Sequence, residues 1–402
     1  MFPSNGATSF MKIGLITEID IRRKEAWSGT ILHMVRAVER TGTSLEMLGP
    51  VCERETIMLR RVDKVLRRLT GQDPMLNRAR TMTRRKGRKV LDLVRSKSVD
   101  VLFAPVGSTL IADLPPTGVP VVYCSDATVR LMLDYYDWFG TPSKVARERA
   151  IASEGAAMRR ADLLTFPTEW AARSAIDDYG IDPDRVFVQP FGANMDDPPP
   201  RAEILGPRAE GPFRLLFCGV QWKRKGGDIV LDAAERLIAA GVDIELTILG
   251  CTPPAEWTPS EALRRATTVI PFLDKKKPDE RARFREIFAR SDLLVLPTQA
   301  ECYGVVFCEA AAFGTVSFGT ATGGVPEVIR EGETGFTLPP GASGASYAEA
   351  IGALLSDPVQ LDRMRHAARD DFETRLNWTT WAEILQERML AVAEGPSKAA
   401  MP

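Results

Sequence analysis

Histidine is scarce in this chain of 402 residues, which contains only His33 and His366. A Ser-His-Asp or Cys-His arrangement needs a histidine beside its nucleophile, and a histidine-rich metal site needs several close together. The six cysteines are scattered and show neither a disulfide nor a zinc spacing. These absences argue against such hydrolases and metal sites, and the isolated thiols favour a reducing cytoplasm.

Long apolar runs are also missing, since no segment approaches the roughly 18 uninterrupted apolar residues that a membrane span requires. The first ten residues lack the charged region and apolar stretch of a signal peptide. Acidic and basic residues balance, 53 against 52, and the most basic region contains no interleaved aromatic residues, which argues against nucleic acid as a partner. We therefore predict a soluble cytoplasmic protein.

The length exceeds the roughly 250 to 300 residues at which single cores stop growing, so two domains are expected. Apolar strands alternate with helical patterns in both halves, which predicts parallel sheets with right-handed crossovers. The loop after the first strand lacks Gly-x-Gly-x-x-Gly, which counts against a dehydrogenase. The predicted class is α/β with two Rossmann-like domains. Their predicted boundaries are 1–194 for the first domain, 195–212 for a linker, 213–375 for the second domain, and 376–402 for a final helix and tail.

Two glutamates, Glu301 and Glu309, flank a predicted junction between a buried strand at 292–296 and a helix at 305–313. The first amides of that helix have no intrahelical partner and lie at the positive end of its dipole, which favours a phosphate. Two carboxylates beside a phosphate would repel it, so they must face hydroxyl groups. A nucleotide diphosphate sugar offers both kinds of group.

The run Glu301-Cys-Tyr-Gly-Val-Val-Phe-Cys-Glu309 resembles the Glu-x7-Glu signature of retaining B-type glycosyltransferases of family 4. Gly323-Gly324-Val325-Pro326-Glu327 and the segment 190–194 extend this resemblance. It implies a GT-B fold, with two Rossmann-like domains facing each other across a cleft and a final helix that returns to the first domain. It also implies sugar transfer from a nucleotide diphosphate donor, with retention of configuration and without a cofactor, to a glycan, lipid-linked or small-molecule acceptor.

The resemblance assigns donor contacts in the second domain. It places Glu301 by the sugar hydroxyls and Glu309 on the ribose, with the remaining contacts from Phe272, Tyr303, Gly304, Val305 and Val306. A departing diphosphate gains negative charge, which either a metal ion or basic side chains must meet. No Asp-x-Asp precedes a candidate metal-binding turn, so a metal-independent reaction is expected. Lys225 occupies the family's phosphate-lysine position, whereas Val220 occupies that of its arginine, and Arg224 or Lys223 is expected to replace that charge.

Three residues of the first domain are candidates for the acceptor or sugar side. Ser28 and Gly29 lie in the loop after the first predicted strand, and Asp126 follows the strand at 119–124. The resemblance expects a histidine at Ser125, so Asp126 is the better candidate to reach the donor sugar. The alternative interpretation is that these residues only begin or cap the helices that follow.

The region 54–97 is helical in pattern and rich in lysine and arginine. It is either a solvated helical surface or a contact with anionic lipid head groups or a phosphorylated acceptor, which would make the protein membrane-peripheral. Two alternative functions remain open at this point. One is a nucleotide-sugar epimerase on the same fold, and the other is a catalytically silent nucleotide-sugar-binding protein.

Overall fold

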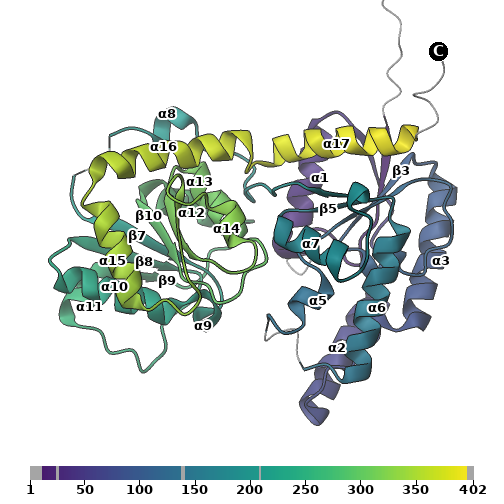
Figure 1. Ribbon diagram of the computed structural model, residues 1–402, viewed down its shortest axis with the longest axis horizontal. Coiled ribbons are helices and arrows are strands. Elements are labelled where there is room, and N and C mark those ends of the chain that lie inside the picture. Colours follow the sequence, from purple (N-terminus) through teal and green to yellow (C-terminus); the bar gives the residue numbers. More distant parts are fainter. Residues whose placement is uncertain (1–10, 24–26, 137–140, 208–209, 396–402) are drawn as a thin grey trace, which may run out of the picture. The chain divides into compact units, whose positions relative to one another are not determined.

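The computed structural model describes residues 11–23, 27–136, 141–207 and 210–395. The chain divides into two compact units (Figure 1). The first domain comprises Met1–Pro190 together with Trp378–Pro402, and the second comprises Phe191–Asn377. The prediction about a signal peptide in residues 1–10 lies outside the described residues, as does the predicted tail from residue 396 onward. The first residues of that tail, predicted to begin at 393, still belong to the last helix, which ends at Glu394.

The first domain is built on a six-stranded parallel sheet in the order β2-β1-β3-β4-β5-β6. Its strands are β1 (Lys12–Leu15), β2 (Ser44–Met47), β3 (Val101–Pro105), β4 (Val121–Cys124), β5 (Leu163–Phe166) and β6 (Val186–Val188). The order reverses direction between β1 and β3. Such a reversal is a topological switch point, where ligands bind in open α/β sheets.

Helices surround this first sheet (Figure 1). They are α1 (Thr30–Arg40), α2 (Glu53–Thr70), α3 (Arg80–Lys97), α4 (Ser108–Ile111), α5 (Val129–Met132), α6 (Lys144–Arg160), α7 (Glu169–Asp177) and α17 (Trp378–Glu394). α1 buries Ile31, Met34, Val35 and Val38, the spacing of an amphipathic helix. It packs against α17, so the last helix completes the first domain.

The basic region predicted as helical forms two helices. α2 ends at Thr70, and the positive φ of 73° at Gly71 suits a glycine just beyond a helix. A short 3-10 turn, η2 (Leu76–Arg78), then leads into α3. The break separates the charges of the region into two helical surfaces.

The second domain contains another six-stranded parallel sheet, in the order β12-β11-β10-β7-β8-β9. Its strands are β7 (Phe213–Cys218), β8 (Ile244–Leu249), β9 (Thr267–Ile270), β10 (Leu293–Leu296), β11 (Val316–Thr320) and β12 (Gly335–Leu338). Counted from β9, this is the 3-2-1-4-5-6 order of doubly wound nucleotide-binding sheets, with its switch point between β7 and β10.

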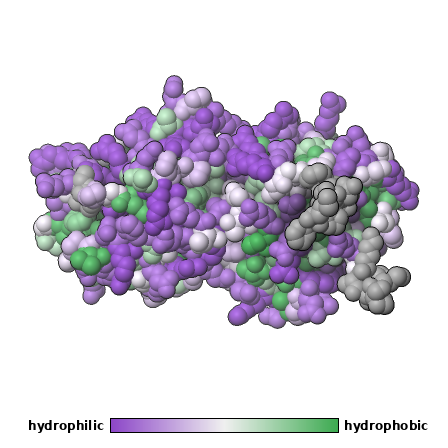
Figure 2. Space-filling model, turned by 90° about the horizontal axis from the view of Figure 1, so that it is seen from above, coloured by the Kyte–Doolittle hydropathy of each residue, from purple (hydrophilic) through white to green (hydrophobic). Residues whose placement is uncertain are grey.

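Its helices are α8 (Arg201–Ile204), α9 (Trp222–Lys225), α10 (Gly227–Ala239), α11 (Glu261–Ala266), α12 (Pro278–Arg290), α13 (Val305–Ala312), α14 (Val325–Val328), α15 (Gly344–Leu355) and α16 (Pro358–Thr374). The prediction of an α/β protein with two Rossmann-like domains is confirmed. The face seen in Figure 2 is largely hydrophilic, with small scattered apolar areas. No helix in the described ranges combines the length and apolarity needed to cross a bilayer.

Candidate functional site

Three predicted residues meet at the switch point of the second domain. Arg224 and Lys225 lie in α9 after β7, and Glu301 lies in the loop after β10. The Lys225 ammonium pairs with Glu301 Oε2, and Arg224 Nη1 lies 3.5 Å from the same oxygen. Lys225 is only 8% exposed. Two cations and a carboxylate therefore gather where this kind of sheet binds ligands.

Backbone contacts fix the two loops that carry these residues. The Gln299 amide donates to the Arg224 carbonyl at 2.7 Å, which ties the loop after β10 to α9. At Gly226, a Cβ atom would lie 2.1 Å from the Pro297 carbonyl oxygen, and φ is +79°. Only glycine permits this approach, so Gly226 holds Lys225 against the end of β10.

Lys225 retains bonding capacity in this arrangement. A lysine ammonium has three N–H donors. Within the described part of the chain, the polar partner of Lys225 Nζ is Glu301. Arg224 is more committed, because its Nη1 also donates to the Ala300 carbonyl at 2.6 Å. The geometry thus leaves Lys225 able to meet an additional anion.

The amino terminus of α13 adjoins this cluster. Gly304 precedes the helix with φ of +89°, and the chain turns there from Glu301 into Val305 and Val306. The first amides of a helix carry no intrahelical bond and face outward with partial positive charge. This geometry favours an anion beside the amides of Gly304, Val305 and Val306, close to Glu301.

Glu309 lies further along α13 and is buried, with 5% exposure. Lys275 Nζ donates to Glu309 Oε1 at 2.6 Å and to the Asn194 carbonyl at 3.3 Å. The ammonium also lies 4.8 Å from the ring centroid of Phe284. Sequence reasoning missed Lys275, because nothing distinguishes it within the run of three lysines at 275–277. Its place shortly after β9, at the same edge of the sheet as Glu301, is the signal that could have found it.

Two predicted donor contacts have contrasting environments. The Tyr303 hydroxyl donates to the Phe191 carbonyl at 2.8 Å, and its ring packs edge-on against Phe191. Because this side chain is buried in packing, we withdraw it as a donor contact. Phe272 is 60% exposed in the segment after β9, where an aromatic ring can stack on a base.

The cysteines near this site are poor nucleophiles. Burial raises the pKa of the Cys218 thiol to about 12, with Glu309 adding to the effect, and burial also raises the pKa of Cys308 to about 12. A thiol must ionise to react, so neither is activated. Across the described ranges, no group of three or more His, Cys, Asp or Glu side chains is placed to hold a metal ion.

A second Glu–Lys cluster lies at the switch point of the first domain. Glu18 follows β1, and Lys86 Nζ donates to Glu18 at 3.0 Å, to Asn77 Oδ1 at 2.6 Å and to Thr109 Oγ1 at 3.1 Å. Arg60 lies 3.2 Å from Glu18. Burial acts to raise the pKa of Glu18, but Lys86 and Arg60 outweigh it and hold that pKa below its ordinary value.

Sequence reasoning treated Lys86 as one charge within a basic surface, and the structure corrects this, because its side chain is fully buried. The sequence feature that indicated its burial was the position of Lys86 in the helical repeat. Thr83, Val90 and Val94 are also buried, and they share one face of α3 with Lys86. A lysine on the apolar face of a helix must find partners, since an unpaired buried charge is very costly.

The predicted first-domain residues are brought together only in part. Trp27 Nε1 donates to Asp126 Oδ2 at 3.0 Å, which joins the loop after β1 to the loop after β4. Thr128, not Asp126, caps α5 by accepting from the Leu131 amide. Ser28 and Gly29 both have positive φ, and no atom of the described residues lies within 4 Å of a Cβ built on Gly29. Gly29 therefore leaves open space beside the loop that Asp126 anchors.

A buried carboxylate supports the loop of Asp126. Glu154 of α6 accepts from the Val129 amide and, at 2.7 Å, from the Tyr179 hydroxyl. Burial raises the pKa of Glu154, although Arg78 and these hydrogen bonds oppose the effect. Ser125, at the position where the resemblance expects histidine, is buried and donates to the Ala127 carbonyl at 2.9 Å. This serine therefore turns inward.

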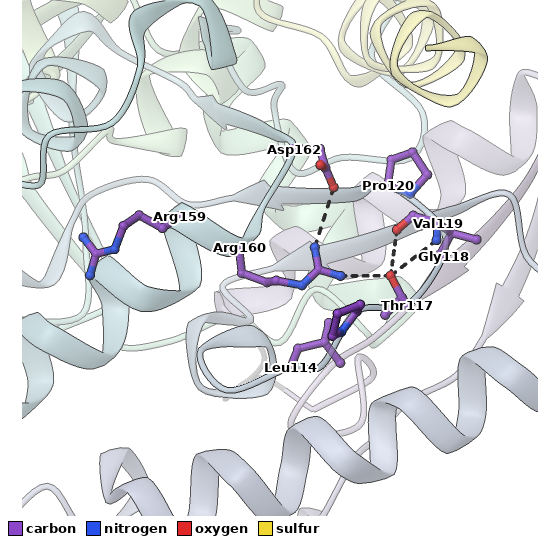
Figure 3. A pocket seen from close by; sticks show the side chains of 9 residues that line it. Leu114, Thr117, Gly118, Val119, Pro120, Arg159, Arg160 and Asp162 are labelled. Carbon is purple, nitrogen blue, oxygen red and sulfur yellow. Dashed lines mark hydrogen bonds and ion pairs between the residues drawn. The ribbon is translucent and has the colours of Figure 1, made fainter. Parts of the chain in front are cut away.

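A pocket at the amino-terminal ends of the strands of the first sheet is a poor candidate site (Figure 3). It lies where β4 and β5 begin, and Arg160, Asp162 and Thr117 are among its lining residues. Arg160 donates to Thr117 Oγ1 at 3.0 Å, and Asp162 accepts from the Val121 amide at 2.8 Å. These side chains serve the chain's own structure, and the carboxyl ends of the strands lie at the opposite edge.

Comparison with known proteins agrees with the geometry of the second domain. Residues 212–357 match the Glycosyl transferases group 1 family. This range begins just before β7 and contains Arg224, Lys225, Glu301 and Glu309. Two similar proteins are named D-inositol 3-phosphate glycosyltransferase. The one from Catenulispora acidiphila is 31% identical over 60% of this chain, and the one from Nocardia farcinica is 30% identical over 61%. The matches span 59% and 55% of those relatives.

Solved glycosyltransferases share the fold of both domains. A glycosyltransferase from Rickettsia africae aligns over 96% of this chain and all of its own, with a TM-score of 0.64 and 13% identity. Anabaena HepE, solved in complex with UDP-glucose, aligns over 94% of this chain and 99% of its own, with a TM-score of 0.60 and 15% identity. WaaG, a glycosyltransferase involved in lipopolysaccharide biosynthesis, aligns over the same shares, with a TM-score of 0.59 and 16% identity. The chain therefore has the GT-B type of fold.

Proposed function

We propose that this protein transfers a sugar from a nucleotide diphosphate donor to an acceptor hydroxyl, with retention of configuration and without a metal ion. The observation that carries the proposal is the cluster of Arg224, Lys225 and Glu301 at the β7–β10 switch point, beside the amino terminus of α13. The family match over residues 212–357 supports the same activity.

Each group of the cluster has a role in this proposal. Lys225, with donors still available, meets the charge that grows on the diphosphate as the glycosidic bond breaks, and Arg224 assists it. The amides from Gly304 to Val306 hold a phosphate oxygen. When the diphosphate takes over Lys225, Glu301 is released to accept hydrogen bonds from the sugar hydroxyls. Fixed cations in these positions supply the charge that a metal ion would otherwise provide.

Glu309 and Lys275 form the ribose side of the proposed site. A buried carboxylate is a strong acceptor for the two ribose hydroxyls, and Lys275 holds it in place. Phe272 is the proposed neighbour of the base. HepE was solved with UDP-glucose, so UDP-sugars are the first donors to test.

Retention is proposed without a protein nucleophile. The buried cysteines near the site have raised pKa values, which disfavours a thiolate intermediate. The leaving phosphate oxygen would instead take the proton of the acceptor hydroxyl as that hydroxyl attacks the same face of the sugar. This mechanism comes from the family resemblance.

The first domain is the proposed acceptor side, through Ser28, Gly29 and Asp126. The hydrogen bond from Trp27 to Asp126 keeps the carboxylate in position, and the open space at Gly29 admits a substrate close to the backbone. A glycan or a lipid-linked sugar is the proposed acceptor class.

The test is a thermal-shift panel of UDP, GDP, ADP and CMP with their common sugars, followed by a transfer assay. A ligand that binds the native state raises its stability by mass action. We expect one nucleotide and its sugar to shift the midpoint, and transfer to persist in chelator. Abolition by chelator with rescue by Mg²⁺ or Mn²⁺ would refute metal independence. A sugar altered without an acceptor would indicate an epimerase, and binding without transfer or hydrolysis would indicate a silent binding protein.

A further inference from the structure

The outward side of α2 carries an apolar stripe that is exposed among the described residues of the first domain. Met58, Val62, Val65 and Leu69 follow one another at spacings of four, three and four residues, so they lie on one side of the helix. Their exposures are 56%, 39%, 54% and 77%. Helical residues with this spacing normally face a core. Thr56 and Asp63, the buried residues of α2, lie on the opposite side and attach the helix to its domain.

The charged residues of α2 are also segregated: its carboxylates are paired within the domain, and its exposed charges are basic. All three of its carboxylates have partners: Glu53 accepts from the Asp20 amide, Glu55 pairs with Arg85 and Lys89, and the buried Asp63 accepts from the Leu76 amide. The exposed charged residues of α2 are all basic, namely Arg54, Arg60, Arg61, Lys64 and Arg68.

A row of three arginines runs along one edge of the stripe. Arg54, Arg61 and Arg68 are seven residues apart, so they project from the same side of the helix as one another. Neither they nor Lys64 form an ion pair within the part of the chain that the structure describes. The surface is therefore a continuous apolar ridge bordered by unpaired positive charge.

We propose that this surface of α2 docks on an anionic lipid bilayer, with the four apolar side chains entering the head-group region. A basic amphipathic helix has the composition of a membrane-surface helix. Anionic head groups complement the arginine row, and a bilayer accepts a convex ridge without needing a matching groove. A second copy of the same surface would bring like charges together, which disfavours self-association. The proposal does not depend on the transferase activity.

The test is flotation of the full-length protein with vesicles of phosphatidylcholine, with and without phosphatidylglycerol. We expect binding only to the vesicles that contain phosphatidylglycerol, and weaker binding at high salt. Arg61→Glu with Arg68→Glu should lower the partition coefficient about tenfold or more, because each basic residue near such a surface contributes appreciably. Val62→Glu with Val65→Glu should lower it by a similar factor, because the apolar ridge can no longer enter the head-group region.

Matched controls lie on the surface of the second domain. Val359→Glu changes a valine that is more exposed than Val62 or Val65, and Arg281→Glu with Arg283→Glu changes two exposed arginines of α12. These variants should bind vesicles like the wild type, and all variants should retain the wild-type unfolding midpoint. Absence of phosphatidylglycerol-dependent binding would overturn the proposal. Equal loss in the control variants would also overturn it, and so would a dimer that Val65→Glu dissociates in the absence of lipid.

Discussion

The two domains place a Glu–Lys pair at the same topological position and use it differently. At the switch point of the first domain, Lys86 is fully buried, and Glu18, Asn77 and Thr109 accept all three of its N–H donors. At the switch point of the second domain, Lys225 is bonded to Glu301 and keeps donors available. An ammonium whose three donors are occupied supports the fold, whereas one with donors available can also bind a ligand. Position in the fold alone therefore does not identify the active pair.

The largest expected effect is on stability, at Lys86. Lys86→Met should lower the free energy of unfolding by about 3 to 5 kcal/mol, because it leaves the carboxylate of Glu18 buried with fewer partners. Urea unfolding would measure this, with the exposed Lys89→Met as control. A loss in Lys86→Met no larger than in the control would mean that the buried network is not structural.

Lys225→Ala should impair turnover rather than stability, in contrast to Lys86→Met. Turnover should fall about 100-fold or more, because a cation facing the leaving diphosphate is lost, while the unfolding midpoint changes little. Steady-state kinetics with the donor identified by thermal shift would test this. Arg283→Ala removes an exposed basic side chain of α12 and should leave turnover unchanged. Wild-type turnover in Lys225→Ala would show that Lys225 does not act on the leaving diphosphate.

A smaller effect is expected at Glu309. Glu309→Gln should weaken donor binding by roughly 1 to 3 kcal/mol, since a buried charged acceptor for the ribose is lost and Lys275 loses its ion pair. Isothermal titration calorimetry would measure it, with the exposed Glu286→Gln of α12 as control. Unchanged donor affinity in Glu309→Gln would show that the Lys275–Glu309 pair does not take part in donor binding.

The smallest effect is the pH dependence contributed by Glu18. Its pKa is lower in the folded protein than in the unfolded chain, so the ionised carboxylate favours folding above the unfolded value. That stabilisation is lost as the pH falls through the folded pKa. Urea unfolding from neutral pH down to about pH 3 should show the decline in the wild type and a shallower one in Glu18→Gln. If the free energy of unfolding fell with pH equally in both proteins, the buried Lys86 network would not draw its stability from the charge of Glu18.

Local sequence patterns indicate the cluster in the second domain more clearly than the one in the first, for physical reasons. Glu301 and Lys225 are marked by local features, a strand end followed by a glycine turn or a helix start, at the carboxyl ends of strands where such sheets bind ligands. The Lys86 network joins four segments that are far apart in the chain, and Lys275 reaches Glu309 across 34 residues. No local pattern encodes such pairings. Only helical register, as at Lys86 among Thr83, Val90 and Val94, hinted at burial.

The assignment of α17 to the first domain has a consequence for biosynthesis. Trp381 of this helix is fully buried and lies 6.3 Å, centroid to centroid, from Phe103 of β3. A ribosome delivers α17 only after every residue of the second domain. The first domain must therefore wait, with its α1 surface uncovered, while the second is synthesised and able to fold. A premature stop just before Trp378 would consequently harm the domain made first and spare the domain made last.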